Sequence, residues 1–104
     1  MSEKIFYTEI ISALEAMTKK VLICDEYEYH CEFCTLGAWG SARGLDLNDI
    51  CLKSITAIAK VDPFVTRDIS VKNNQFEGSN EGRWVFMRNY VQSKLDKLED
   101  QVTA

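Results

Sequence analysis

Three cysteines and the only histidine of the chain fall close together and have the clearest capacity for chemistry: Cys24, His30, Cys31 and Cys34. Thiolate and imidazole are the ligands that zinc takes in tetrahedral structural sites. Cys31 and Cys34 have the spacing of a zinc knuckle, but His30 adjoins Cys31 and a second, separated pair of ligands is missing. We therefore expect these cysteines to be small core residues or free thiols, with no metal or other cofactor. A small zinc-binding regulatory domain is the alternative.

A nucleophilic catalytic site would have to use His30, because the chain has no other histidine. The candidate nucleophiles are the cysteines and Ser41, and Ser41 does not lie in a G-x-S-x-G motif. A redox function of Cys31 and Cys34 would need a helix N-terminus that lowers the thiol pKa, and no capping residue precedes this pair. The sequence therefore predicts a protein that is not an enzyme and has no catalytic residues.

An acidic and aromatic row is the strongest candidate for a binding surface. If this row is a strand, Glu28, His30 and Glu32 line one face, because alternate side chains of a strand point the same way. Asp25 and Glu26 stand at its start. Like charges along one strand face repel each other mildly, and a basic partner surface would relieve that repulsion. We predict that these five residues contact a partner protein.

Glycines at positions 37, 40 and 44 predict a flexible loop over 35–44. The loop has neither the Gly-Lys-Ser/Thr ending of a phosphate loop nor the G-x-G-x-x-G spacing of a dinucleotide site. Two interpretations stay open. The segment is either a connector that folds Trp39 onto the core, or a binding loop that presents Trp39 and Arg43 to the same partner. Tryptophan and arginine are favoured at interface hot spots.

Hydrophobic spacing predicts three amphipathic helices, over 3–22, 47–61 and 80–100. Pro63 is expected to end the second. Alternation of apolar and polar residues predicts a small antiparallel sheet, with strands near 21–34 and 64–71.

In the first of these strand regions, Asp25 and Glu26 are the expected turn of a hairpin. The predicted fold class is α+β, with the helices packed on the sheet. A mostly α-helical fold is the alternative, because 26–36 also fits helical spacing.

Length and charge limit the classes of function. A chain of 104 residues is expected to form a single domain over 1–104. The net charge is −4, and residues 1–52 carry four basic and nine acidic side chains. No basic patch of the kind that releases counterions from phosphate is present, so direct nucleic-acid binding is not expected. The basic residues of the last helix are interleaved with acids, which predicts a solvated face: Arg83, Arg88, Lys94 and Lys97.

The expected location is the cytoplasm. No apolar run is long enough to span a bilayer, no signal-peptide pattern is present, and no membrane contact is predicted. The predicted function is a small acidic protein-interaction module, an inhibitor of the immunity, antitoxin or phage anti-defence type. Its partner would be another protein with a basic surface, such as a nucleic-acid-processing enzyme or complex. A homodimer stays open.

Overall fold

The computed structural model describes residues 2–29, 31–48 and 50–103, with side chains described as far as residue 99. The described residues form five helices and one two-stranded sheet, in the order α1 (Glu3–Ala16), β1 (Glu28–Tyr29), β2 (Glu32–Phe33), α2 (Thr35–Ala42), α3 (Leu52–Ala59), α4 (Pro63–Gln75) and α5 (Asn80–Thr103). The fold is therefore mostly helical with a small antiparallel sheet, which confirms the prediction in outline. The number of helices differs from the three predicted.

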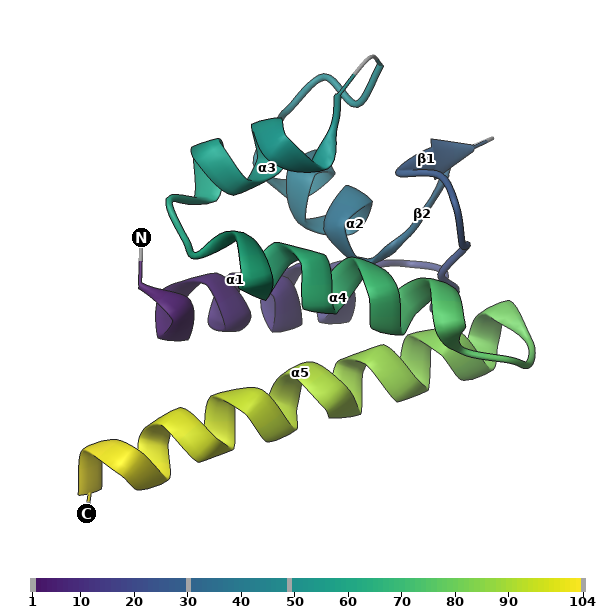
Figure 1. Cartoon of the computed structure of the whole chain (residues 1–104). Helices are drawn as coiled ribbons and strands as arrows, with labels where there is room; N and C mark the ends of the chain where they lie inside the picture. Colours follow the sequence, from purple (N-terminus) through teal and green to yellow (C-terminus); the bar gives the residue numbers. More distant parts are fainter. Residues whose placement is uncertain (1, 30, 49, 104) are drawn as a thin grey trace.

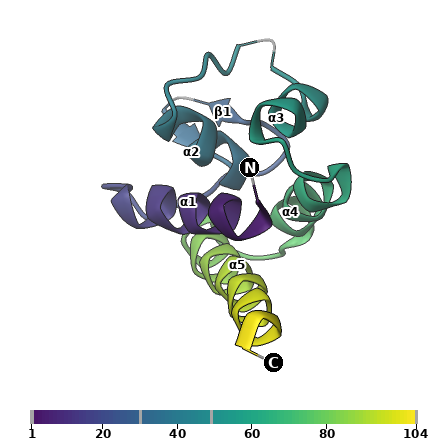
Figure 2. The same ribbon diagram turned by 90° about the vertical axis from the view of Figure 1, so that its left-hand side faces the viewer.

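The helices are stacked in layers (Figures 1 and 2). α5 runs beneath α1 and α4, while α2, α3 and the hairpin of β1 and β2 lie above them. α1 packs against both α5 and α2, and α4 packs against α2, α3 and α5. The core between these layers is apolar, and its largest fully buried side chains include Trp39, Phe6, Ile10, Leu14, Ile55, Ile69, Met87 and Val91. No helix of the described residues is both long and apolar enough to cross a membrane.

α1 begins where the sequence predicts but ends earlier. The Ser2 hydroxyl accepts a hydrogen bond from the Ile5 amide (3.2 Å), which caps the helix. At the other end Met17 turns to an extended conformation, so the predicted helix over 3–22 stops at Ala16. Lys20 lies outside the helix, but its ammonium group donates to the carbonyls of Leu14 and Glu15. A cation at this end of a helix is favourable, because the helix dipole is negative there.

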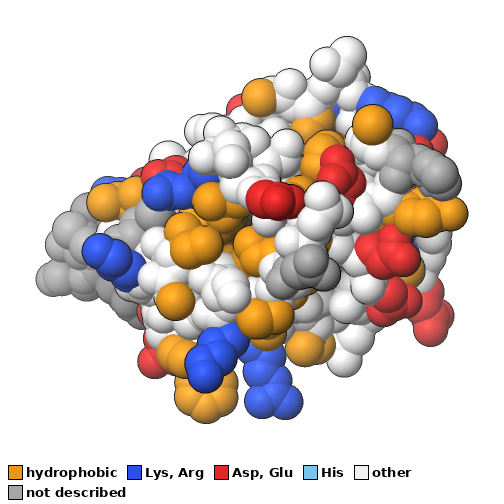
Figure 3. All heavy atoms as spheres, turned by 90° about the horizontal axis from the view of Figure 1, so that it is seen from above, with side chains coloured by type: hydrophobic (Ala, Val, Ile, Leu, Met, Phe, Trp, Pro, Cys, Tyr) orange, Lys and Arg blue, Asp and Glu red, His pale blue; other side chains and the backbone are white. Residues whose placement is uncertain are grey.

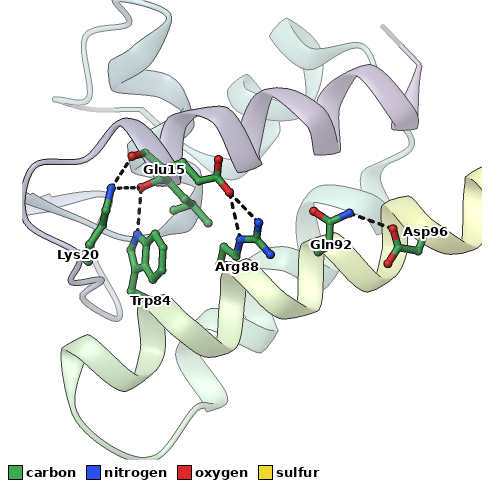
Figure 4. Close-up of polar contacts among 7 residues, drawn as sticks. Glu15, Lys20, Trp84, Arg88, Gln92 and Asp96 are labelled. Carbon is green, nitrogen blue, oxygen red and sulfur yellow. Dashed lines mark hydrogen bonds and ion pairs between the residues drawn. The ribbon is translucent and has the colours of Figure 1, made fainter.

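Polar contacts join α1 to α5 (Figure 4). The Trp84 indole donates to the Leu14 carbonyl (3.1 Å), and the Arg88 guanidinium donates to the Glu15 carboxylate (2.7 Å). The Lys20 ammonium also lies over the Trp84 ring. These polar contacts hold α5 against the C-terminal end of α1, in addition to the apolar packing between the two helices.

The predicted glycine-rich loop over 35–44 is wrong, because most of it forms α2. The Cys34 sulfur accepts a hydrogen bond from the Gly37 amide (3.3 Å) and caps this helix. A Cβ atom at Gly37 would lie 1.8 Å from the Tyr27 carbonyl oxygen. The glycine is therefore required by close backbone packing and does not mark a flexible segment.

The predicted helix over 47–61 is shorter than expected: α3 begins only at Leu52, after an N-cap at Cys51. Within α3, Ile55 is fully buried, whereas Ile58 is 38% exposed.

The predicted strand near 64–71 is wrong, because this segment lies in α4. Pro63 does not end a helix but occupies the first turn of this one, where its missing N–H costs nothing. Asp62 caps the helix by accepting from the Phe64 amide (2.8 Å). The apolar pattern was ambiguous, because Val65 and Ile69 are four residues apart and share a buried helix face as readily as a strand face.

A hairpin lies within 21–34, but its strands and its turn are not the predicted ones. β1 pairs antiparallel with β2, placing Glu28 opposite Phe33 and Tyr29 opposite Glu32. The chain therefore reverses between Tyr29 and Glu32 instead of at Asp25 and Glu26, and Cys31 has a positive φ of 65°.

A buried polar network holds the hairpin segment against α4. Asn73 is 1% exposed, and its side-chain oxygen accepts from both the amide and the hydroxyl of Thr35 (3.0 and 2.8 Å). Its amide nitrogen donates to the Ile23 carbonyl (2.8 Å). Asn73 thus binds both the segment before the hairpin, at Ile23, and the first residue of α2 after it, Thr35.

Arg83 continues the network from α5. Its guanidinium donates to the carbonyls of Asn73 (2.9 Å), Leu22 (3.0 Å) and Phe76 (3.2 Å), and to the Asn80 side chain (2.7 Å). Arg83 is only 5% exposed, so the expectation that it belongs to a solvated face is wrong.

We predict that Gly37→Ala destabilises the protein by about 3 kcal/mol or more, because the new methyl group meets backbone atoms that cannot move aside. Gly40→Ala in the same helix is the matched control. There the nearest atom is a methyl carbon of Leu47 at 3.0 Å, and the gain in helix propensity opposes the crowding. We expect a change within about 1 kcal/mol for Gly40→Ala in urea unfolding. Equal effects of the two substitutions would contradict the close packing of α2 on Tyr27.

Candidate functional site

The hairpin forms an acidic projection between α1 and α2. From Val21 to Ala42 the chain contains four carboxylates and no lysine or arginine. Asp25, Glu26 and Glu28 are exposed. In Figure 3 several acidic side chains gather on the side of the molecule that carries the hairpin in Figure 1. The local negative charge is therefore high although the net charge of the chain is modest.

The register of the hairpin separates two carboxylates that were predicted to share a face. Cross-strand partners lie on the same face of a two-stranded ribbon. Glu28 therefore shares a face with Phe33, and Glu32 shares the other with Tyr29. The prediction assumed one continuous strand, and the turn between the two residues reverses the chain. His30, which was expected between them on this face, lies outside the described residues.

The carboxylates also differ in their ion pairing. Glu32 is partly buried and bonds the Lys19 ammonium group at 2.9 Å, and this bond raises the pKa of Lys19. Among the ion pairs between described residues, none includes Asp25, Glu26 or Glu28. These three carboxylates are therefore exposed and lie outside the ion pairs between described residues.

Tyr29 is an exposed aromatic residue beside these carboxylates, and it was not among the predicted site residues. A single continuous strand would place Tyr29 on the face opposite Glu28 and Glu32, but in the hairpin 56% of it is exposed and it shares a face with Glu32. Each strand has only two residues, and no residue of β1 is buried on either face. The alternation of apolar and polar residues therefore did not predict which side chains are buried here.

The base of the hairpin is anchored to α4. The Asp25 amide donates to the Asn74 side chain (3.0 Å), and Asp25 has a φ of 66°. Asp25 and Glu26 line a small cavity of about 180 Å³, which Tyr27, Ser70 and Asn73 also border. The backbone bearing the carboxylates is therefore held in place by contacts from a second element.

Trp39 does not reach this surface. It is 1% exposed, packs edge-on against Phe6 at 5.1 Å between ring centroids, and donates to the Glu9 carboxylate (3.1 Å). Arg43 bonds the same carboxylate (2.7 Å) and lies over the Trp39 ring. Trp39 is a core residue, as the connector interpretation expects. It lies in the middle of α2, and Arg43 follows the last residue of that helix.

The cysteines fall into distinct environments. Cys34 is buried, and burial raises the pKa of its thiol to about 11. Cys31 and Cys51 are exposed, and hydrogen bonds from Ser54 lower the pKa of Cys51. The described residues contain no group of three or more side chains placed to hold a metal ion. A zinc ligand must be a thiolate, and the surroundings of Cys34 favour the neutral thiol.

We predict that all four cysteines are free thiols and that the folded protein protects Cys34. With Ellman's reagent near pH 8, Cys31 and Cys51 should react first, and Cys34 only as fast as the structure opens. Mass spectrometry of the modified peptides identifies the sites, and Cys34→Ser should leave the fast phase unchanged. Fewer than four thiols in the denatured, unreduced protein would reveal a disulfide, and fast reaction of Cys34 would contradict its capping role.

No family model, curated protein or solved structure matches this chain, so its function has to be argued from the geometry of these residues.

Proposed function

We propose that the protein is a non-catalytic module that binds another protein through the acidic hairpin surface, defined as Asp25, Glu26, Glu28 and Tyr29. The observation that carries the proposal is the combination of three exposed carboxylates outside the described ion pairs with an exposed aromatic ring. Such a surface is costly to keep together without a partner, because like charges repel. A basic surface on the partner would offset that cost.

Each part of the surface has a different role in binding. The carboxylates accelerate encounter with a basic partner, since charge complementarity acts mainly on the association rate. The exposed ring of Tyr29 would be buried against the partner, and tyrosine is among the residues that dominate binding energy at interfaces. The anchoring of Asp25 to α4 reduces the ordering cost, because the backbone is held before binding.

The biological role we propose is inhibition. A small acidic module that occupies a basic surface would compete with the phosphate backbone for a nucleic-acid-processing enzyme or complex. Immunity proteins, antitoxins and phage anti-defence proteins act in this general manner, and the link to them is an analogy of charge and size. We leave Trp39 out of the proposed surface, because a buried side chain offers nothing to a partner.

We predict that a photo-crosslinking amino acid in place of Tyr29 captures a protein partner in cells that naturally contain the chain. Ile5 is the matched control, because it is similarly exposed (52%) but lies on α1, outside the hairpin. A specific adduct at position 29 and none at position 5 supports the proposal. Equal capture at both positions, capture of nucleic acid, or no adduct at position 29 contradicts it.

With the captured partner purified, Glu26→Lys combined with Glu28→Lys should slow association about tenfold at low salt, and less as salt rises. Glu3→Lys combined with Asp96→Lys makes the same change in net charge on α1 and α5 and should have a much smaller effect. Thermal melts of both variants establish that each is folded, since exposed charges change stability by only about 0.5 kcal/mol. Equal slowing by the two pairs would mean that net charge, and not the hairpin, governs binding.

A further inference from the structure

A second surface lies between α3 and α4, and its chemistry is opposite to that of the hairpin. A groove of about 420 Å³ runs between these helices and is lined by Leu52, Lys53, Thr56, Ala57, Pro63 and Arg67. Phe64 follows Pro63 in the first turn of α4 and is 76% exposed. In Figure 3 hydrophobic and basic side chains lie beside each other along the edge that carries α4. A large exposed aromatic ring next to an apolar groove indicates an interaction site.

The floor of the groove is mostly hydrocarbon, and its one polar side chain, Thr56, is hydrogen-bonded within the protein. The Thr56 hydroxyl donates to the Leu52 carbonyl (2.8 Å) and contacts the hydroxyl of the buried Thr66 (2.5 Å). Its hydrogen-bonding capacity is thus used within the chain. Leu52, Ala57 and Pro63 supply hydrocarbon only, so the floor favours an apolar side chain.

The charges around the groove are positive. Lys53 and Arg67 line it, and neither takes part in an ion pair between described residues. Neither of the acids near them in sequence, Asp62 and Asp68, lines the groove, and each accepts a hydrogen bond within the fold. Asp62 caps α4 through the Phe64 amide, and Asp68 accepts a hydrogen bond from the Tyr90 hydroxyl at 2.6 Å. The groove therefore presents hydrocarbon flanked by two cations.

We propose that this groove binds an acidic amphipathic segment of a partner protein. One apolar face of the segment would lie on Leu52, Ala57 and Pro63 and against Phe64, with its carboxylates at Lys53 and Arg67. Charge complementarity favours an acidic occupant, and the apolar surface extends beyond the groove to Phe64, as helix-in-groove recognition requires. The proposal is independent of the acidic hairpin surface, which would attract a partner of the opposite charge.

The test is NMR titration of the ¹⁵N-labelled full chain with a synthetic helical peptide of roughly 16 residues. The peptide carries leucines at i, i+3, i+4 and i+7 and glutamates beside that stripe. We expect amide shifts concentrated over 52–57 and 64–67. A second peptide in which lysines replace the glutamates should shift these amides far less. Shifts elsewhere only, or equal shifts with both peptides, would overturn the proposal.

Two variants separate charge from apolar contact. Lys53→Glu combined with Arg67→Glu should weaken peptide binding about tenfold or more, whereas Lys4→Glu combined with Lys97→Glu, with the same change in net charge, should not. Phe64→Ser should also weaken binding, and all of these residues are exposed, so the variants should remain folded. If the same amides shift with protein concentration alone, the occupant is a second copy of the chain and the proposal fails. Unchanged binding by the Lys53 and Arg67 variant would also refute it.

Discussion

The buried guanidinium of Arg83 joins the C-terminal end of α4, the start of α5 and the segment that leads into the hairpin. No ion pair between described residues includes it. Its charge is compensated by carbonyl oxygens, two of which, from Asn73 and Phe76, lie at the end of α4, where the helix dipole is negative. A third carbonyl, from Leu22, belongs to the segment after α1. Burying a cation is costly unless such partners are fixed in place, so these three segments have to assemble together.

The consequence for function is that the hairpin does not depend on its own short strands for its position. Two-residue strands contribute little stability by themselves. Asn73 binds both ends of the hairpin segment, at Ile23 and Thr35, and Arg83 fixes the Asn73 backbone. The network thus positions the acidic hairpin surface while leaving its side chains exposed. The basic groove between α3 and α4 lies outside this network, and its composition points to a partner of a different kind.

The long amphipathic helices were predictable from apolar spacing, because α1 and α5 bury the stripes that the sequence shows. Short elements were not. Val65 and Ile69 fit a strand and a helix equally, and only the tertiary contacts of α4 decide between them. Gly37 indicated a loop, but its function is to admit the Tyr27 backbone. At the site, Asp25, Glu26 and Glu28 are exposed as expected, but Glu32 is partly buried. The orientation of Glu28 depends on a turn that no local signal marked. Arg83 lies four residues before the buried Met87, and that spacing was the one available sign of its burial.

The most direct test of the network is the free energy of unfolding in urea of Arg83→Lys, compared with that of Arg88→Lys. A lysine keeps the charge but cannot serve carbonyls on several segments at once. We predict that Arg83→Lys lowers the free energy of unfolding by at least about 2 kcal/mol, because buried carbonyls lose their donor. Arg88→Lys changes an exposed ion pair with Glu15 and should lose less than about 1 kcal/mol. Equal stability of the two variants would contradict the claim that the fold depends on Arg83.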